Sequence, residues 1–487
     1  MIADRGLLAG PENSLYIPLL RQWLKKCDEN HECHSKKHFW PTRVIFVGPS
    51  DSTELELWET EEKKSVLSDA DGYIALSHCW GRLTDEEKRK ICTTAENFET
   101  RKGGFPLSDL PKTFQDAVEV TRQLGKKYLW IDALCIKQQI PNEGNPDFEI
   151  EAPLMGQIFG SAFCTLAASS AVDWKQGFLA PRPTSYDADG TPFQTPQYDV
   201  DAAPLNKRAW VLQERVLSRR TLHFTESYTY FECGDGVRCE NLIRLKGREI
   251  KEYFLLDPRF PERLYSSGYM RSLDFIQHLF EKYAQYQLTN ESDRNIAILS
   301  LMKRMSDVFR TGHRYGIFEC FRFRLLLWRP GPQSNDGKNV VDTQKLPSWS
   351  WMRYSQILFF ETWSLSLEVP RNGAFEFSYE QQCVLSIRIR QLKDYTMEQQ
   401  GSEHFILDAK SEHVGVLWFD TMTDASIPIQ KCVIVGRESS GESQDSEKTC
   451  YILLVGDMTS EKSYKRVGVG KIKARCISKR YWDGELC

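Results

Sequence analysis

The sequence predicts an α/β protein built around a parallel β-sheet. Three apolar runs, at 73–77, 128–131 and 163–169, have the length and composition of buried strands. Helical periodicity lies between them, at 111–125 and 149–161. Strands that alternate with helices at this spacing are typical of a parallel sheet with right-handed crossovers.

Several elements are expected before and within this alternation. An amphipathic helix is predicted over 14–28, and short strands over 43–47 and 54–58. The helix over 111–125 begins with Pro111, which suits a first helical turn, and stops at Gly125. A short helix at 208–217 and strands at 221–224 and 227–232 complete the predicted fold.

The length of the chain requires more than one domain. A chain of 487 residues is too long for one compact core. We expect an N-terminal helix and a loop containing Cys and His over 1–40, followed by an α/β domain over 41–245. A helical segment over 246–330 and a β-rich region over 331–487 are expected to follow.

Composition limits the functional classes. The formal net charge of -4 gives no electrostatic case for nucleic acid or a membrane surface as partner. No apolar run approaches the roughly 20 residues that span a bilayer. The 14 cysteines are scattered without a CxxC pair, as in a reducing compartment. We therefore expect a cytoplasmic protein without disulfides.

The segment from Cys27 to His38 is dense in cysteine and histidine. Both residue types are zinc ligands, but the spacing matches no standard zinc finger and the second half of a site is missing. A polar loop after a helix explains the segment more simply. We therefore expect no metal.

Polar side chains gather where the predicted strands end. Ser77 and His78 close the first strand, Trp80 follows them, and Asp132 closes the second strand. The carboxyl ends of parallel strands meet at one edge of a sheet, where ligands bind. Asp132 either joins such a site or caps the turn that follows it. Trp80 and Gly81 either line the site or form a tight turn.

Glu214 is the strongest candidate for a catalytic carboxylate. It lies four residues after Trp210, so the two share one helical face. A carboxylate beside an indole suits ribose hydroxyls and a developing positive charge, as in glycosidases. The alternative is an ion pair, because Arg208, Arg215, Arg219 and Arg220 are close in sequence.

Cys79 is a weaker candidate for a nucleophile. Adjacent residues on a strand point to opposite faces, so His78 is poorly placed to activate it. A Cys/His pair would need another histidine, such as His223. His78 by itself is expected to serve as a hydrogen-bond donor or proton carrier.

Three blocks of sequence together resemble a known family. They are Tyr73–Gly81 (YIALSHCWG), Leu110–Gln138 (LPKTFQDAVEVTRQLGKKYLWIDALCIKQ) and Arg208–Phe224 (RAWVLQERVLSRRTLHF). Their order and wording closely resemble the three motifs of the fungal heterokaryon-incompatibility (HET) domain. The resemblance covers roughly residues 70–225.

The resemblance implies a cytoplasmic fungal protein of non-self recognition and cell-death signalling. It also implies a TIR-like, flavodoxin-like parallel sheet, because HET domains are thought to be distant relatives of TIR domains. Some TIR domains cleave NAD, and Trp210-Val-Leu-Gln-Glu214 is similar to their Trp-x-x-x-Glu arrangement. The resemblance then implies NAD or a related nucleotide as substrate rather than bound cofactor. Glu214 would be catalytic, and Ser77, His78, Trp80, Asp132 and Trp210 would bind the substrate.

Two other functions remain open at the level of sequence. One is a non-catalytic signalling module that acts by self-association or through a protein partner. The other is a HET scaffold reused as an enzyme of another pathway, since fold does not fix function.

Overall fold

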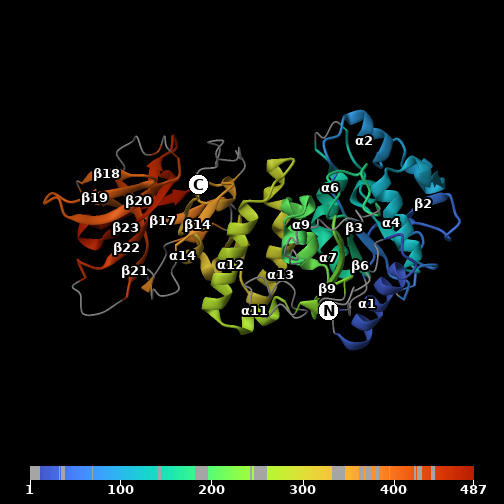
Figure 1. Cartoon of the computed structure of the whole chain (residues 1–487). Coiled ribbons are helices and arrows are strands. Elements are labelled where there is room, and N and C mark those ends of the chain that lie inside the picture. Colours follow the sequence, from blue (N-terminus) through green and yellow to red (C-terminus); the bar gives the residue numbers. More distant parts are fainter. Residues whose placement is uncertain are drawn as a thin grey trace, which may run out of the picture. The chain divides into compact units, whose positions relative to one another are not determined.

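The chain forms two compact units (Figure 1). The first contains the described residues up to Arg263 together with Ile296–Leu301, and the second contains Leu264–Asn295 and Met302–Cys487. The computed structural model describes residues 11–31, 33, 39–68, 70–140, 144–180, 196–241, 244–245, 260–331, 346–360, 367–368, 375–378, 383–393, 395–421, 424, 430–439 and 445–487.

The first unit is built on a ten-stranded sheet with the order β10-β9-β8-β7-β6-β3-β5-β1-β2-β4. The strands are β1 (Arg43–Phe46), β2 (Glu54–Glu59), β3 (Ile74–Ser77), β4 (Phe105–Pro106), β5 (Tyr128–Trp130), β6 (Cys164–Ala167), β7 (Arg220–Phe224), β8 (Thr229–Cys233), β9 (Gly236–Cys239) and β10 (Arg244–Leu245).

Only the centre of this sheet is parallel. β5, β3, β6 and β7 pair in parallel, whereas every other pairing in the sheet is antiparallel. The predicted α/β class is confirmed, but the sheet is mixed rather than wholly parallel. The short connections explain the antiparallel pairs, because β7 and β8 are joined by four residues and β8 and β9 by two. Links this short allow only hairpins, in which the two strands are antiparallel.

Helices precede and connect the strands of the first unit. They are α1 (Tyr16–Asn30), α2 (Asp85–Ile91), α3 (Phe98–Gly103), α4 (Lys112–Gln123), α5 (Asp132–Cys135), α6 (Pro146–Glu151), α7 (Met155–Ser161), α8 (Pro196–Asp201) and α9 (Ala209–Leu217). In α4, Phe114, Ala117, Val118 and Thr121 are buried, as the helical periodicity predicts.

The central strands carry the core of the first unit. Ile74, Ala75 and Leu76 in β3 and Leu129 and Trp130 in β5 are almost fully buried. Strands buried on both faces read as continuous apolar runs, which is why they were detectable in the sequence. The polar residues that follow them therefore lie at the edge of a rigid scaffold.

The second unit begins with helices and continues with strands. Its helical part contains α11 (Glu262–Ser266), α12 (Tyr269–Ala284), α13 (Leu299–Phe309) and α14 (Arg322–Leu325). Helices α11 and α13 each contain residues of both units. Two small antiparallel pairs accompany them: β11 (His313–Arg314) with β12 (Ile317–Phe318), and β13 (Trp328–Pro330) with β14 (Ile357–Phe359).

The predicted β-rich C-terminal region is confirmed, and its strands form a second sheet (Figure 1, red). Pairings among β17, β21, β22, β23 and β24 close into a ring. The strands are β15 (Leu367–Glu368), β16 (Glu376–Phe377), β17 (Leu385–Leu392), β18 (Thr396–Gln400), β19 (Glu403–Leu407), β20 (His413–Phe419), β21 (Lys431–Glu438), β22 (Thr449–Asp457), β23 (Ser463–Lys473) and β24 (Ile477–Leu486).

None of the helices within the described ranges has the length and hydropathy required to cross a membrane.

Candidate functional site

Ser77 and Glu214 meet at the carboxyl end of β3. Ser77 is the last residue of β3, and Glu214 lies in the second turn of α9, 137 residues further along the chain. The Ser77 hydroxyl donates a hydrogen bond to Oε2 of Glu214. Both side chains are buried, with Glu214 only 8% exposed. The contact therefore fixes the carboxyl group that the sequence singled out.

The environment of Glu214 changes its protonation. Burial raises the pKa of Glu214 to about 7, because desolvation disfavours the charged form. The hydrogen bond from Ser77 and the charge of Arg208 act in the opposite direction, whereas the Asp132 carboxylate adds to the increase. A carboxyl group with a pKa near neutrality exists in both forms at physiological pH, which suits acid–base chemistry.

His78 is held in place by its neighbours on three sides. Its carbonyl accepts a hydrogen bond of 2.6 Å from Nη1 of Arg208, and its Nδ1 lies 3.7 Å from Oδ1 of Asp132. Its ring meets Phe114 edge-on, with centroids 4.9 Å apart. Burial lowers the pKa of His78 to about 4, although Asp132 opposes this. The imidazole is therefore neutral at pH 7.

One nitrogen of His78 has no hydrogen-bond partner among the described residues. Within the described part of the chain, nothing hydrogen-bonds to its Nε2, although this atom is buried. Most buried polar atoms in proteins are paired, so this Nε2 is available to a further hydrogen-bond partner.

Both carboxylate oxygens of Asp132 accept hydrogen bonds within the domain. Its Oδ1 accepts a 2.7 Å hydrogen bond from the Ala133 amide at the start of α5, and its Oδ2 accepts one of 2.8 Å from Nε1 of Trp80. The Trp80 ring in turn stacks on Trp174, with centroids 5.9 Å apart. Asp132 thus orders the turn after β5 and ties it to the segment after β3. Its side chain is still 29% exposed.

Trp210 is placed differently from the other predicted site residues. It lies one turn before Glu214 on α9, but its ring meets Phe148 of α6 edge-on, with centroids 5.7 Å apart. It is partly buried and packs against the main core of the first unit. The structure therefore brings together Ser77, His78, Trp80, Asp132 and Glu214, whereas Trp210 contributes packing behind Glu214.

The nearby arginines have other partners. Arg215 binds both oxygens of Glu232 at 2.8 Å and Asp201 at 2.6 Å, and Arg220 pairs with Asp28. None of the ion pairs found among the described residues includes Glu214. The ion-pair alternative for Glu214 is therefore not found.

Cys79 has an apolar environment rather than a catalytic one. It packs with Ala167, Leu205 and Val211, and burial raises the pKa of its thiol. His223, the histidine considered as its partner, lies 2.8 Å from Oε2 of Glu232 through Nε2. No Cys79–His223 pair forms.

A buried polar network that the sequence did not indicate surrounds Glu232. Glu232 in β8 contacts Arg215 and His223, and Nδ1 of His223 lies 3.4 Å from Oγ of Ser169. Burial opposes ionisation of Glu232, but Arg215 and His223 hold the pKa of this carboxyl well below its usual range. A glutamate inside the apolar run 227–232 was the available signal.

These features define a mixed α/β domain with a buried carboxyl–hydroxyl pair where its central strands end. Residues 73–214 match the family model described as Heterokaryon incompatibility protein (HET). This segment is therefore similar to the HET family, as the three sequence blocks predicted. The match begins beside β3 and ends at Glu214. No curated protein and no solved structure matches the chain.

Proposed function

We propose that this protein acts in fungal non-self recognition and cell-death signalling by cleaving NAD, or a related nucleotide, at its glycosidic bond. The observation that carries the proposal is the buried Ser77–Glu214 pair, whose carboxyl group has a pKa of about 7. Glu214 is the catalytic carboxyl group, and Ser77 positions it.

The chemistry of the reaction fits such a group. The bond between ribose C1′ and the nicotinamide nitrogen breaks, and nicotinamide leaves as a neutral molecule with the bonding electrons. The ribosyl group then carries oxocarbenium-like positive charge until a water oxygen bonds to C1′ and releases a proton. Ionised Glu214 stabilises that charge and accepts hydrogen bonds from ribose hydroxyls.

His78 and Asp132 support a ligand at the same place. The unpaired Nε2 of neutral His78 is a hydrogen-bonding group for a substrate atom. Asp132 is partly exposed and retains acceptor capacity beyond its bonds to Ala133 and Trp80. Trp80 provides an indole surface beside them.

The strand order supports a TIR-like, flavodoxin-like relationship. Numbered along the chain, the four parallel strands β3, β5, β6 and β7 have the spatial order 2-1-3-4, and flavodoxin-like sheets have the order 2-1-3-4-5. In such sheets ligands bind outside the carboxyl ends of the strands, where the order reverses. That point lies between β3 and β6, beside Ser77.

Nicotinamide release from NAD by the purified full-length protein tests this proposal. We expect release by the wild type and a loss of about 100-fold or more in Glu214→Ala and Glu214→Gln, because a positioned carboxyl contributes that much. Glu226→Gln is the matched control, since Glu226 is exposed in the same domain. It should retain wild-type activity.

No release by the wild type, or equal release by Glu214→Ala, would refute the catalytic claim. Self-association with toxicity that survives Glu214→Ala would support the non-catalytic signalling module. Glycosidic cleavage of another nucleotide, with NAD left intact, would place the scaffold in another pathway.

A further inference from the structure

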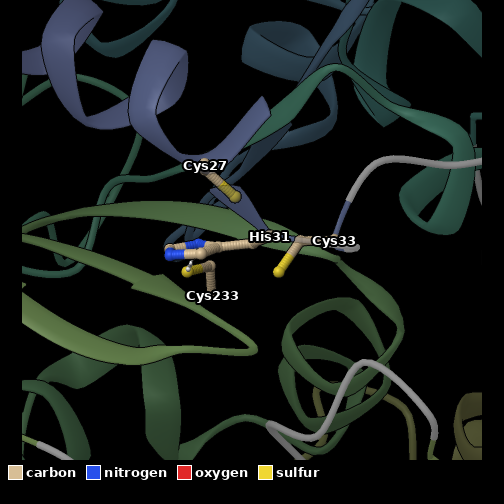
Figure 2. Close-up of side chains that lie close together, drawn as sticks. All are labelled: Cys27, His31, Cys33 and Cys233. Carbon is tan, nitrogen blue, oxygen red and sulfur yellow. Dashed lines mark hydrogen bonds between the residues drawn. The ribbon is translucent and has the colours of Figure 1, made fainter. Parts of the chain in front are cut away.

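Three cysteines and one histidine converge outside the proposed catalytic site. They are Cys27, His31, Cys33 and Cys233, and their ligand atoms all lie within 4.8 Å of one another. Cys27 is in the last turn of α1, His31 caps that helix, and Cys33 follows two residues later. Cys233 is the last residue of β8. Figure 2 shows the four side chains gathered between the end of α1 and β8.

We propose that these four residues form a structural zinc site of the Cys3His type. Thiolate and imidazole ligands in this combination select zinc, and Cys3His is a common structural set. The fourth ligand is Cys233, 200 residues after Cys33 in the sequence. The segment Cys27–His38 contributes three ligands, and Cys233 supplies the fourth that this segment lacks by itself.

The spacing of the ligand atoms agrees with a tetrahedral site. Zinc lies about 2.3 Å from sulfur and about 2.0–2.1 Å from nitrogen, so a tetrahedron sets sulfur and nitrogen about 3.6 Å apart. Nδ1 of His31 lies 3.6 Å from Sγ of Cys233. The three thiols are free rather than joined in disulfides.

A second contact prepares His31 as a ligand. Its Nε2 lies 3.1 Å from Oδ2 of Asp235, which is in the turn between β8 and β9. Donation from Nε2 to this carboxylate leaves the Nδ1 lone pair free to bind metal. Metal-binding histidines commonly have such a carboxylate partner. Arg238 also contacts Asp235, at 3.2 Å, and holds the carboxylate in place.

The site is closed and therefore structural. Cys27, Cys33 and Cys233 are between 0% and 3% exposed. Four protein ligands fill a tetrahedral shell, whereas catalytic zinc keeps one position for water. Three ligands precede the HET segment 73–214 in the sequence, and Cys233 follows it. A bound metal would therefore cross-link the chain before this segment to the strands after it.

The contacts between α1 and β8 show why the site can assemble. The Tyr16 hydroxyl lies 2.7 Å from Oγ1 of Thr229, and the Trp23 ring stacks on Phe231 with centroids 6.1 Å apart. The helix therefore packs along the strand that carries Cys233. The apolar packing places the ligands, and the metal then fixes the arrangement.

Metal analysis of the full-length protein, purified under reducing conditions, tests the site. We expect one zinc ion per chain, and less than a tenth of that in Cys233→Ala. Cys239→Ala is the control, because Cys239 is equally buried in the neighbouring strand but lies outside the cluster. It should retain one zinc ion.

Cobalt substitution keeps the test independent of variant folding. Wild-type protein stripped of metal and loaded with Co²⁺ should show a thiolate-to-cobalt charge-transfer band and the intense visible bands of a tetrahedral site. Added zinc should abolish both. A wild-type protein without zinc that also fails to bind Co²⁺ would overturn the proposal, as would unchanged zinc content in a folded Cys233→Ala variant.

Discussion

At the scale of single residues, the proposed function depends on the carboxyl group of Glu214. Its helix places it against Ser77, and its burial separates it from the solvent that would otherwise stabilise its charge. A surface carboxylate at the same position would be fully ionised at pH 7. The position of Glu214, rather than its residue type, makes it suitable for chemistry.

The raised pKa of Glu214 makes stability depend on pH. The folded protein keeps this proton up to about pH 7, whereas an unfolded glutamate loses it near 4.5. Between these values the folded state binds more protons, so the stability due to protonated Glu214 is lost as pH rises towards 7. The loss is on the order of 3 kcal/mol.

Thermal unfolding between pH 4.5 and 8 measures this effect. Glutamine cannot ionise, so Glu214→Gln should gain in melting temperature relative to the wild type as pH rises. Glu226→Gln should follow the wild type throughout. Parallel curves for the wild type and Glu214→Gln would show that Glu214 is not protonated in the folded protein.

Some residues of the site could be predicted from sequence, and others could not. Ser77, His78 and Asp132 were recognisable because each ends or follows an apolar run. The partners of Arg215 and Glu232 were not recognisable, because they depend on which strands pair and in which register. Cys233 was missed as a possible ligand for the same reason, since β8 brings it beside α1.

At the scale of elements, local signals predicted more than long-range ones. The helix expected over 111–125 appears as α4, because its apolar spacing and its terminal Gly125 are local features. The single helix expected over 149–161 is instead α6 and α7, separated by a 3-10 turn at Ala152–Leu154. Pro153 explains the break, since its ring and missing N–H disfavour a continuous helix.

Gly81 shows how one turn shapes the end of β3. Its φ is +78°, and an added Cβ would lie 2.4 Å from Cβ of Asp173. Gly125 has a similar φ of +76°, but no atom of the described residues lies within 4 Å of its added Cβ. A residue with a side chain would therefore have a strained backbone at both positions, but its Cβ would meet a neighbouring atom only at position 81.

Alanine at these two positions separates the two effects. Gly125→Ala should cost about 1–2 kcal/mol of unfolding free energy, from the left-handed backbone alone. Gly81→Ala should cost about 1–3 kcal/mol more, because the methyl group overlaps Asp173. Urea unfolding measures both, and equal losses would contradict the close approach of the two segments after β3 and β6.

At the scale of the whole molecule, the HET segment accounts for only part of the chain. The composition and strand-like runs were sufficient to predict a β-rich C-terminal region. They did not predict the ring formed by β17, β21, β22, β23 and β24, because closure requires pairing between distant strands. The proposed zinc site likewise depends on contact between residues 200 positions apart.

The proposed function requires that this protein signals by consuming NAD at the Glu214 site. The most direct test measures NAD and viability in the same fungal hyphae after induced expression of the full-length protein. With the wild type and with Glu226→Gln, we expect the NAD concentration to fall before viability is lost. With Glu214→Gln at the same protein level, we expect both the NAD concentration and viability to stay unchanged. Cell death with unchanged NAD, or equal NAD loss with Glu214→Gln, would contradict the claim.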